Sequence, residues 1–394
     1  MEKRIIISTD TFLDLDSGNQ LLFQSVLENL CNSGNKVCFV SRNLSRLTEV
    51  KNTIKPFNEL YFKTRHEILN ALALNDNIKN FYLVVGSKNK DFEMAVNNKL
   101  LYLVPTWNAI KEDKAIKYGI MFDDISTFDE IIKSLNNQNN WYYDLTLPDK
   151  THVYSLMCAH SKTSDVTLDE KRLVEGFEAF LKRGNGTYYK ILLCHFLAFM
   201  SNNPDFRDID TWGIMPSSTL TLNADMLRFK EIVRCFMKGQ VPRSLLKTPQ
   251  INNVFLRSHQ VQKSHNTSEY IRKQNGATIH LDSIYINNAY VDARGRSKLI
   301  GKNVCIFDDY LTHGNSFEAL RNMLKAAGAN KIIFVSLGRF RKDYLYQNYQ
   351  ISGDLFKPNG FQYKLIDKQV EYGQYNNEAR SELRSLNTIF PTFV

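Results

Sequence analysis

An acidic pair at the end of an apolar run is the feature of this sequence that most directly indicates chemistry. Residues 304–316 read VCIFDDYLTHGNS, so Asp308 and Asp309 follow four apolar residues. Carboxylates at the C-terminal end of a parallel strand face the crevice in which α/β sheets bind ligands, and they accept hydrogen bonds from vicinal hydroxyl groups such as those of ribose. The pattern therefore predicts that these two aspartates bind a sugar.

The loop that follows the acidic pair has the composition of a phosphate site. A helix is expected to begin at its end, and the unpaired amides and the dipole of a helix N-terminus favour a phosphate dianion. Gly314 permits a backbone conformation or a close approach that a side chain would obstruct. The residues expected to hold the phosphate are Thr312, His313, Gly314, Asn315 and Ser316.

An acidic turn that only caps a helix is the alternative interpretation, because Ser and Thr are common before helices. Residues 122–127, FDDIST, also combine paired acids with hydroxyls, but they lack a glycine and a long preceding strand. We assign that segment to a turn. In residues 304–316 the order of all the parts favours ligand binding.

Residues 304–316 resemble the 5-phosphoribosyl-1-pyrophosphate (PRPP) motif of type I phosphoribosyltransferases, in which two acids precede a Thr-x-Gly-x-Ser/Thr loop. His313 replaces the more usual second Thr, and Tyr310 is bulkier than usual. Neither change removes a role that the motif assigns. The resemblance covers residues 150–340 and does not name the acceptor.

Two further segments are similar to the competence-protein (ComF-like) branch of that family. Residues 212–219 read WGIMPSST, and the resemblance implies that Ser217, Ser218 and Thr219 contact pyrophosphate. Residues 257–266 lie where the family has a mobile loop, whose cations Arg257, Lys263 and His265 would steady the departing pyrophosphate. Ordinary turn residues and a solvated basic loop are the alternative interpretations of these two segments.

The reaction that the resemblance implies is displacement of pyrophosphate from ribose C1 by a nitrogen nucleophile, through an oxocarbenium-like transition state. Positioning and charge stabilisation should dominate such a reaction. Mg²⁺ is the implied cofactor, ligated mostly by the substrate and water. The acceptor is a nucleobase, another amine, or a nucleotide that is cleaved in the reverse direction by pyrophosphorolysis.

The N-terminal part resembles a haloacid-dehalogenase (HAD) fold with a damaged active site. Asp10 follows the first apolar run as the nucleophile of that family does, but Phe12 stands where an acid/base Asp belongs. Ser41 matches the phosphate-binding Ser/Thr, and Asp91 matches one metal-binding acid while Ser87 replaces the other. The resemblance implies lost or altered hydrolase chemistry. Alternatively, Asp10 and Asp91 are simply turn or cap residues.

The fold class expected is α/β with two domains, because 394 residues exceed what one compact core usually covers. A polar segment at 135–140 marks the expected boundary between a degenerate HAD-like domain, residues 1–140, and a phosphoribosyltransferase-like domain, residues 150–394. The end of the second domain, from residue 353, is left unassigned. Strands are expected at 5–7, 36–40, 81–85, 100–104, 211–215, 303–307 and 331–337, and helices at 21–30, 67–74, 167–182, 225–237 and 316–327.

Composition limits the class of protein more than its function. Apolar residues at 43% supply a sizeable core, and the six cysteines form no Cys-x-x-Cys pair, so neither disulfides nor structural zinc is expected. No apolar run is long enough for a bilayer and no secretory h-region follows Lys3 and Arg4, which favours a cytoplasmic protein without membrane contact. The net charge of +9 suits nucleic acid and phosphorylated metabolites equally.

Two rival functions stay open. One is a regulatory or effector module that binds PRPP, a nucleotide, nucleic acid or a protein partner without turnover, and the other is an active HAD phosphatase. The pairing of the two domains also resembles proteins of bacterial stress-response and anti-phage operons, in which nucleotide metabolism is modified. The oligomeric state is left open.

Overall fold

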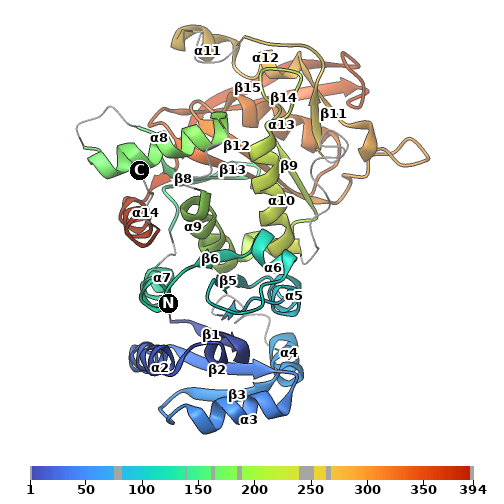
Figure 1. Cartoon of the computed structure of the whole chain (residues 1–394). Helices are drawn as coiled ribbons and strands as arrows, with labels where there is room; N and C mark the ends of the chain where they lie inside the picture. The colour runs from blue at the N-terminus through green and yellow to red at the C-terminus, as the bar shows by residue number, and fades with distance from the viewer. Residues whose placement is uncertain are drawn as a thin grey trace.

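The computed structural model describes residues 2–74, 82–137, 140–160, 165–183, 189–238, 253–262 and 268–390. Two sheets, one parallel and one mixed, lie at opposite ends of the molecule with helices between them (Figure 1). The chain is therefore α/β, as the alternation of apolar strands and amphipathic helices predicts. No helix among the described residues is long and apolar enough to cross a bilayer.

The first sheet is parallel throughout and has the strand order β3-β2-β1-β4-β5-β6. Its strands are short runs of buried apolar residues, which is the pattern of a sheet covered on both faces. The strand order reverses between β1 and β4, and the carboxyl ends of strands at such a switch point are where α/β sheets commonly form a ligand crevice. The strands are β1 (Arg4–Ser8), β2 (Lys36–Ser41), β3 (Leu60–Thr64), β4 (Tyr82–Val85), β5 (Leu101–Pro105) and β6 (Ile120–Phe122).

Helices connect these strands, and side-chain caps begin several of them. Asp16 accepts a hydrogen bond from the amide of Asn19 at the start of α2, and Asn43 caps α3 in the same way. The helices are α1 (Thr9–Leu13), α2 (Ser17–Asn32), α3 (Leu44–Thr53), α4 (Arg65–Leu74), α5 (Asn89–Asn97), α6 (Asp113–Tyr118) and α7 (Ile125–Asn137).

The polar segment expected as a boundary belongs in part to helix α7. Asp124 accepts from the amide of Thr127 at 2.7 Å and so starts this helix, while Phe128, Ile131 and Leu135 are buried. The apolar spacing upstream carries the helix into the asparagine-rich segment as far as residue 137, and residues 138–139 lie outside the described part. The segment expected as a boundary therefore overlaps the last turn of α7, while residue 140, the expected end of the first domain, lies beyond this helix.

The second sheet has the order β16-β7-β8-β13-β12-β9, in which β8, β13, β12 and β9 are parallel and β7 and β16 are antiparallel to their neighbours. Since β7 begins at Tyr143, residues between the two expected domains belong to this sheet. The strands are β7 (Tyr143–Thr146), β8 (His152–Cys158), β9 (Thr211–Ile214), β12 (Asn303–Leu311), β13 (Lys331–Arg339) and β16 (Gln374–Tyr375).

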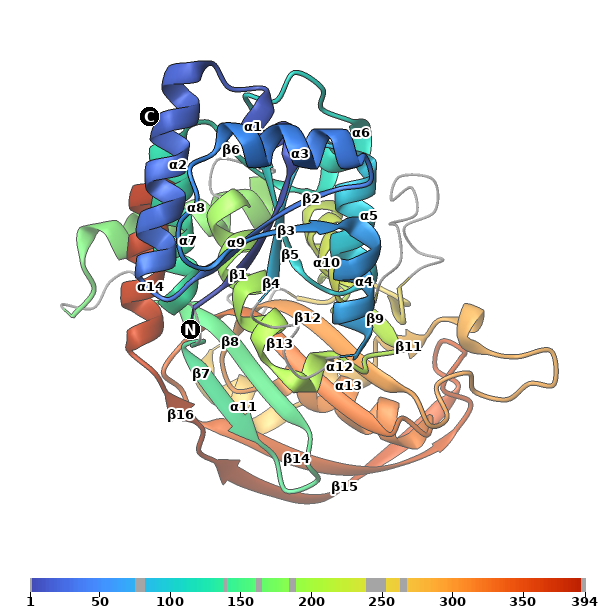
Figure 2. The same ribbon diagram turned by 90° about the horizontal axis from the view of Figure 1, so that it is seen from below.

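Two antiparallel strand pairs and further helices complete the described portion of this part. Pair β10 (Phe255–Arg257) and β11 (Ile284–Ile286) is short, whereas β14 (Tyr344–Gly353) and β15 (Phe361–Glu371) form a long hairpin at the periphery (Figure 2). Most of the stretch left unassigned by sequence is thus this hairpin and α14. The helices are α8 (Leu168–Arg183), α9 (Tyr189–Asn202), α10 (Ala224–Lys238), α11 (Glu269–Asn275), α13 (Asn315–Ala326) and α14 (Glu378–Ile389), with the single turn α12 (Thr278–Leu281).

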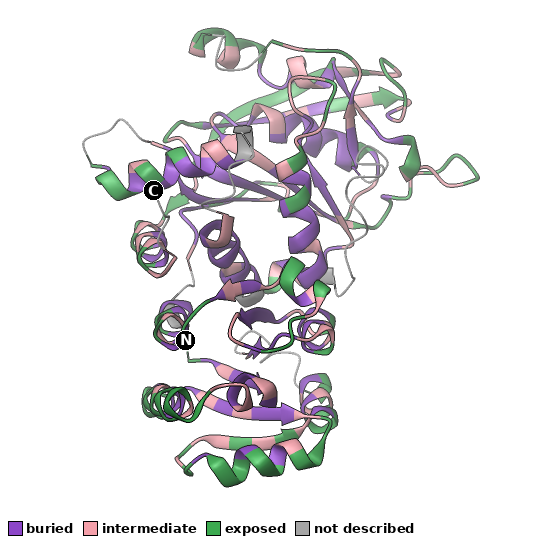
Figure 3. Cartoon of the chain, in the orientation of Figure 1, coloured by how far each residue is buried: buried purple, intermediate pink, exposed green. Residues whose placement is uncertain are grey.

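One hydrophobic core joins the two sheets. Helix α9 packs against β5 and β6, α10 against α5, and α14 against α7. The fully buried ring of Phe92 on α5 meets that of Phe236 on α10 edge to face, with 6.2 Å between ring centroids. Figure 3 shows these facing helix surfaces as buried. The two sheets therefore form one packed body.

Candidate functional site

The loops predicted to bind pyrophosphate and phosphoribosyl groups leave the same edge of the second sheet. Strand β9 pairs in parallel with β12, with Ile214 opposite Phe307. Residues 216–219 and residues 308–316 follow these paired positions directly. The tertiary structure thus brings together two segments that are about 90 residues apart in the chain.

The acidic pair lies within strand β12, not after it as expected. Strand β9 stops at Ile214, but β12 continues beside β13, with Asp308 opposite Ser336 and Tyr310 opposite Gly338. The longer neighbour β13 supplies backbone partners that keep the acidic segment extended. One side of this segment consequently lies beyond the β9 ladder, which ends at Phe307.

Asp308 is held inside the site by its own neighbours. Its Oδ2 accepts a hydrogen bond from the Ser316 hydroxyl at 2.9 Å, and its Oδ1 accepts from the amide of Asp309 at 2.9 Å. Burial raises the pKa of Asp308 well above its ordinary value, and the adjacent charge of Asp309 adds to the rise. The Asp308 carboxyl group within β12 and the Ser316 hydroxyl in the first turn of α13 therefore form one hydrogen-bonded unit.

Gly314 is the residue that turns the chain into α13. Its φ of +81° is left-handed, and a Cβ there would collide with the ring of Tyr344, so two independent constraints require glycine. No side chain caps the first turn of this helix. Thr312 and Ser316 are partly exposed beside it. The first turn thus offers backbone amides and the Thr312 hydroxyl to an anion, while the Ser316 hydroxyl already donates to Asp308.

His313 and Asn315 bind protein groups. The Nδ1 atom of His313 lies 3.0 Å from the carbonyl oxygen of Asp343, and its Nε2 lies 3.5 Å from a carboxylate oxygen of Glu269. Burial lowers the pKa of His313. The amide group of Asn315 donates to the carbonyl of Arg272 at 2.8 Å.

The hydroxyls of the loop predicted to bind pyrophosphate bond to one another. Ser217 Oγ lies 2.9 Å from Thr219 Oγ1, and Thr219 Oγ1 lies 3.0 Å from Thr221 Oγ1. The carbonyl of Ser218 accepts from the amide of Val261 at 3.0 Å. The loop is therefore tied to the segment that follows β10, and its three predicted residues are partly exposed.

Arg257 lies at the end of strand β10, not in a loop, and this corrects the expectation of a mobile cation. Its side chain is 7% exposed, its Nε donates to the carbonyl of Ser217 at 2.6 Å, and its Nη2 donates to the carbonyl of Pro216 at 3.2 Å. Nη1 also donates to the hydroxyl of Ser283. Burial lowers the pKa of Arg257 to about 10, against the opposing effect of nearby Asp308.

The Arg257 side chain therefore holds the backbone carbonyls of Pro216 and Ser217 in place. It also brings a positive charge close to Asp308. An arginine next to a short apolar strand gives no sequence signal for such burial. The other two expected loop cations, Lys263 and His265, lie outside the described residues.

The N-terminal crevice holds its acids in ion pairs with the chain's own cations. Asp10 on α1 lies 2.7 Å from Arg46 and 2.5 Å from Lys88. Burial acts to raise the pKa of Asp10, but these two cations outweigh it and hold the pKa below its ordinary value. Phe12 is buried and packs against Phe39, with 5.7 Å between ring centroids. The residue in the acid/base position is thus part of the core.

The remaining residues of this crevice also have structural partners. Asp91 is fully buried, binds Arg65 at 2.6 Å and accepts from the amide of Lys88 at the start of α5. Ser87 donates to the carbonyl of Ile110, and Ser41 accepts from the amide of Asn43. Within the described ranges, no three His, Cys, Asp or Glu side chains are grouped so that they could hold a metal ion.

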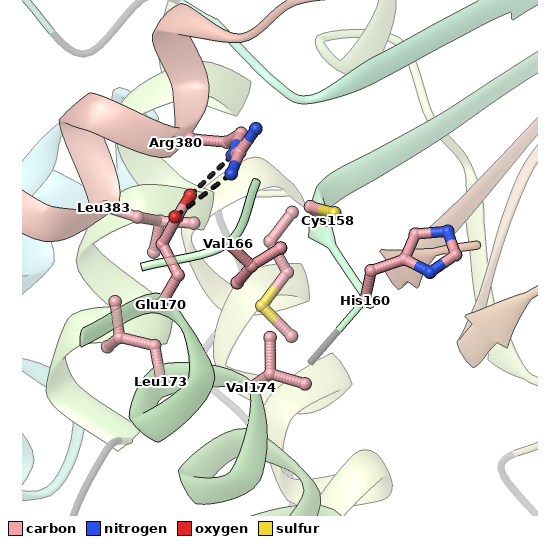
Figure 4. Close-up of a pocket in the computed structure, with 9 residues that line it drawn as sticks. Cys158, His160, Val166, Glu170, Leu173, Val174, Arg380 and Leu383 are labelled. Atoms are coloured by element: carbon pink, nitrogen blue, oxygen red, sulfur yellow. Dashed lines mark hydrogen bonds and ion pairs between the residues drawn. The ribbon is translucent and has the colours of Figure 1, made fainter. Parts of the chain in front are cut away.

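A separate cavity lies at the carboxyl end of β8, between α8 and α14 (Figure 4). Apolar side chains such as Val174 and Leu383 line it, and an ion pair between Glu170 and Arg380 borders it. Its volume of about 20 Å³ accommodates about one water molecule. It is too small for a nucleobase in this conformation.

No family model, curated protein or solved structure matches this chain. Two charged residues near His313 were not predicted from the sequence. Glu269 and Lys342 lie 44 and 29 residues from His313 along the chain, yet they form an ion pair of 2.9 Å beside its ring.

Proposed function

We propose that this protein is a phosphoribosyltransferase that binds PRPP with Mg²⁺ at the carboxyl edge of the second sheet. The observation that supports this most directly is the unit made by Asp308, Ser316 and the left-handed Gly314. It places a carboxyl group and an uncapped helix N-terminus at adjacent positions. A carboxyl group can bind a ribose hydroxyl and a helix N-terminus can bind a phosphate, so this short segment supplies both groups that a ribose 5-phosphate needs.

The second support is the adjacency of the loop at 217–219. PRPP carries pyrophosphate on C1 and phosphate on C5, so a single ligand needs two anion-binding loops on either side of a sugar site. Strands β9 and β12 provide that arrangement because they are paired neighbours. The buried charge of Arg257 beneath the first loop favours an anion there.

In this proposal the chain acts mainly by positioning. Asp308 and Asp309 orient the ribose through its hydroxyls, and the first turn of α13 fixes the 5-phosphate. The loop at 217–219 holds the pyrophosphate as the bond to C1 lengthens and negative charge develops on the leaving group. A nitrogen nucleophile attacks C1, and pyrophosphate departs with the electron pair of the broken bond.

The two aspartates are suitable oxygen ligands for Mg²⁺, but they are too few for a complete protein-made site. An ion bound here would take most of its ligands from PRPP and water, where it neutralises charge on the leaving group. The acceptor is a nitrogen compound that enters from the open side of β12. The N-terminal crevice is proposed to be non-catalytic, since its acids are already paired.

Calorimetric titration with PRPP in the presence of Mg²⁺ tests the proposal. The wild-type protein should bind saturably, and the double variant Asp308→Asn, Asp309→Asn should bind at least about 100-fold more weakly, because two charge-assisted hydrogen bonds of about 1.5–3 kcal/mol each are lost. Far-UV circular dichroism of the variant checks that the fold is retained.

The matched control is Asp123→Asn with Asp124→Asn, which changes the paired acids of the helix-capping turn and keeps a capping side chain at residue 124. Its affinity for PRPP should equal that of wild type. Equal binding by the Asp308/Asp309 variant would overturn the site assignment. PRPP binding without pyrophosphate release against any nitrogen acceptor would favour the regulatory module instead.

A further inference from the structure

Helix α11 is attached to the phosphate loop by polar contacts and not by a hydrophobic face. None of its residues is buried, and Tyr270 is 75% exposed. It lies at the outer end of the molecule (Figure 1). A seven-residue helix without core contacts has little stability of its own, so its position depends on the few bonds that anchor it.

The N-terminal end of α11 is anchored by one carboxylate among cations. Glu269 lies 2.9 Å from Lys342 and 3.5 Å from His313, and Lys273 of the same helix is 3.4 Å away. The hydrogen bond from Lys342 is the main reason that the pKa of Glu269 falls to about 2. We call Glu269, His313 and Lys342 the phosphate-loop latch.

Two residues of the phosphate loop, His313 and Asn315, contact α11. His313 precedes the left-handed Gly314, its ring is 1% exposed, and its Nε2 has no hydrogen-bond partner although it faces Glu269. Asn315 donates to the carbonyl of Arg272 on α11. The same helix thus covers the two residues on either side of the glycine that begins α13.

The other end of α11 has a separate attachment about which it can pivot. The amide of Ala277 donates to Gln347 Oε1 at 2.9 Å. Gly276, which lies between α11 and Ala277, has a positive φ of +56°. Gln347 is fully buried on β14. Rotation at this glycine would lift the Glu269 end while the Gln347 end stays in place.

We propose that α11 is a lid whose Glu269 carboxylate holds Lys342 beside the phosphate loop until a ligand phosphate displaces it. The inference rests on the proposed function in that the displacing group is a phosphate bound at residues 312–316. A dianionic phosphate at these residues competes with the single Glu269 carboxylate for Lys342. Binding then releases the N-terminal end of α11 and opens the face that it covered.

The test measures phosphate affinity and hydrogen exchange of residues 270–276 in full-length wild type and Glu269→Gln, with inorganic phosphate and PRPP as probes. The variant should bind inorganic phosphate about three- to tenfold more tightly, because the competing carboxylate is gone. Its α11 amides should exchange fast without ligand. In wild type they should become fast only when phosphate is added.

Two controls separate the latch from general electrostatics. Asp343→Asn removes an equal charge beside the latch, yet only the Asp343 backbone carbonyl contacts His313, so its affinity should change less than twofold. Glu59→Gln breaks a distant ion pair with Lys36 of the same length, 2.9 Å, and similar exposure, and it should change nothing. Lys342→Met should speed α11 exchange but weaken phosphate binding.

Equal phosphate affinity in wild type and Glu269→Gln, or a gain no larger than that of Asp343→Asn, would overturn the lid while leaving PRPP binding intact. Slower α11 exchange on phosphate addition would also overturn it. The predicted response to phosphate without any PRPP binding would support the lid and contradict the phosphoribosyltransferase. Failure of both proteins to bind either probe would overturn both.

Discussion

At the scale of single residues, the carboxyl group of Asp308 is expected to lower the free energy of unfolding, because its charge is poorly solvated. It is shielded at the end of β12, it lies next to a second acid, and its pKa is well above the ordinary value mainly because burial disfavours the charge. The Ser316 hydroxyl compensates only in part. A partly buried acid that forms no ion pair with any described residue is typical of a site that gains its partners from a ligand.

The pH dependence of stability follows from this raised pKa. Between the unfolded pKa of about 3.9 and the higher folded value, the folded state binds more protons, so the free energy of unfolding falls as pH rises. Asp308→Asn removes this titration and should be more stable than wild type at pH 8 by at least about 1 kcal/mol. The difference should vanish near pH 4. Urea unfolding at both pH values measures it. Asp309→Asn removes the charge that adds to the raised pKa of Asp308, so it should lessen the fall in stability with pH without abolishing it. A variant less stable than wild type at pH 8 would contradict the assignment of cause.

At the scale of elements, a buried ion-pair network fixes α13 against β14 and so sets the position of the phosphate loop. Glu318 and Arg321 on α13 are fully buried and lie 2.7 Å apart. Glu318 also accepts from the hydroxyl of Tyr344 at 2.7 Å and from the amide of Gln347 at 2.8 Å. Asp149, in the turn before β8, pairs with the far side of Arg321. The helix cannot slide along the sheet without breaking these bonds.

Glu318→Gln should therefore lower the free energy of unfolding by about 3 kcal/mol, because removing one partner leaves a buried guanidinium only partly compensated. The matched control is Glu93→Gln, since Glu93 pairs with Lys90 at the same 2.7 Å and three-residue spacing but on the surface. That change should cost less than about 1 kcal/mol. Chemical denaturation of both variants gives the comparison, and equal losses would show that burial does not set the strength of the α13 network.

At the scale of the whole molecule, the two sheets share a core although the sequence is that of two successive α/β units. The facing helices α5 and α10, and α7 and α14, close the space between the sheets with buried side chains (Figures 1 and 3). Two parts of a protein that share a large apolar interface unfold together, because unfolding one part would expose the apolar surface of the other to water.

Phe236→Ala is expected to destabilise both sheets at once. It removes the ring that meets Phe92 across the interface, and such a change costs about 3–5 kcal/mol. Hydrogen exchange in increasing urea should show the strands of both sheets losing protection in one transition, which shifts as a unit in the variant. Two separate transitions in the wild-type protein, with only the second moved by the substitution, would show that the sheets are independent.

The sequence by itself determined the local elements and the chemical character of the main site. Apolar runs predicted those strands and helices that were expected to within a few residues, although β12 extends four residues further than expected. The helix expected from residue 167, for example, is α8, which begins with hydrogen bonds between Thr167 and Glu170. The order of Asp308, Gly314 and Ser316 predicted an acidic strand end followed by a glycine turn and a helix, whereas the hydrogen bond between Asp308 and Ser316 was not predicted. Such features depend on neighbours along the chain, where dihedral preferences and side-chain spacing decide the outcome.

Only the tertiary structure decided what surrounds those residues. The continuation of β12 past the acids depends on the length of β13, the burial of Arg257 depends on carbonyls 40 residues away, and the latch joins Glu269 to residues of two later segments. From the sequence alone a charged residue is expected to be exposed, because removing a charge from water costs free energy. Whether partners offset that cost is settled by the packing of distant segments, which local patterns do not encode.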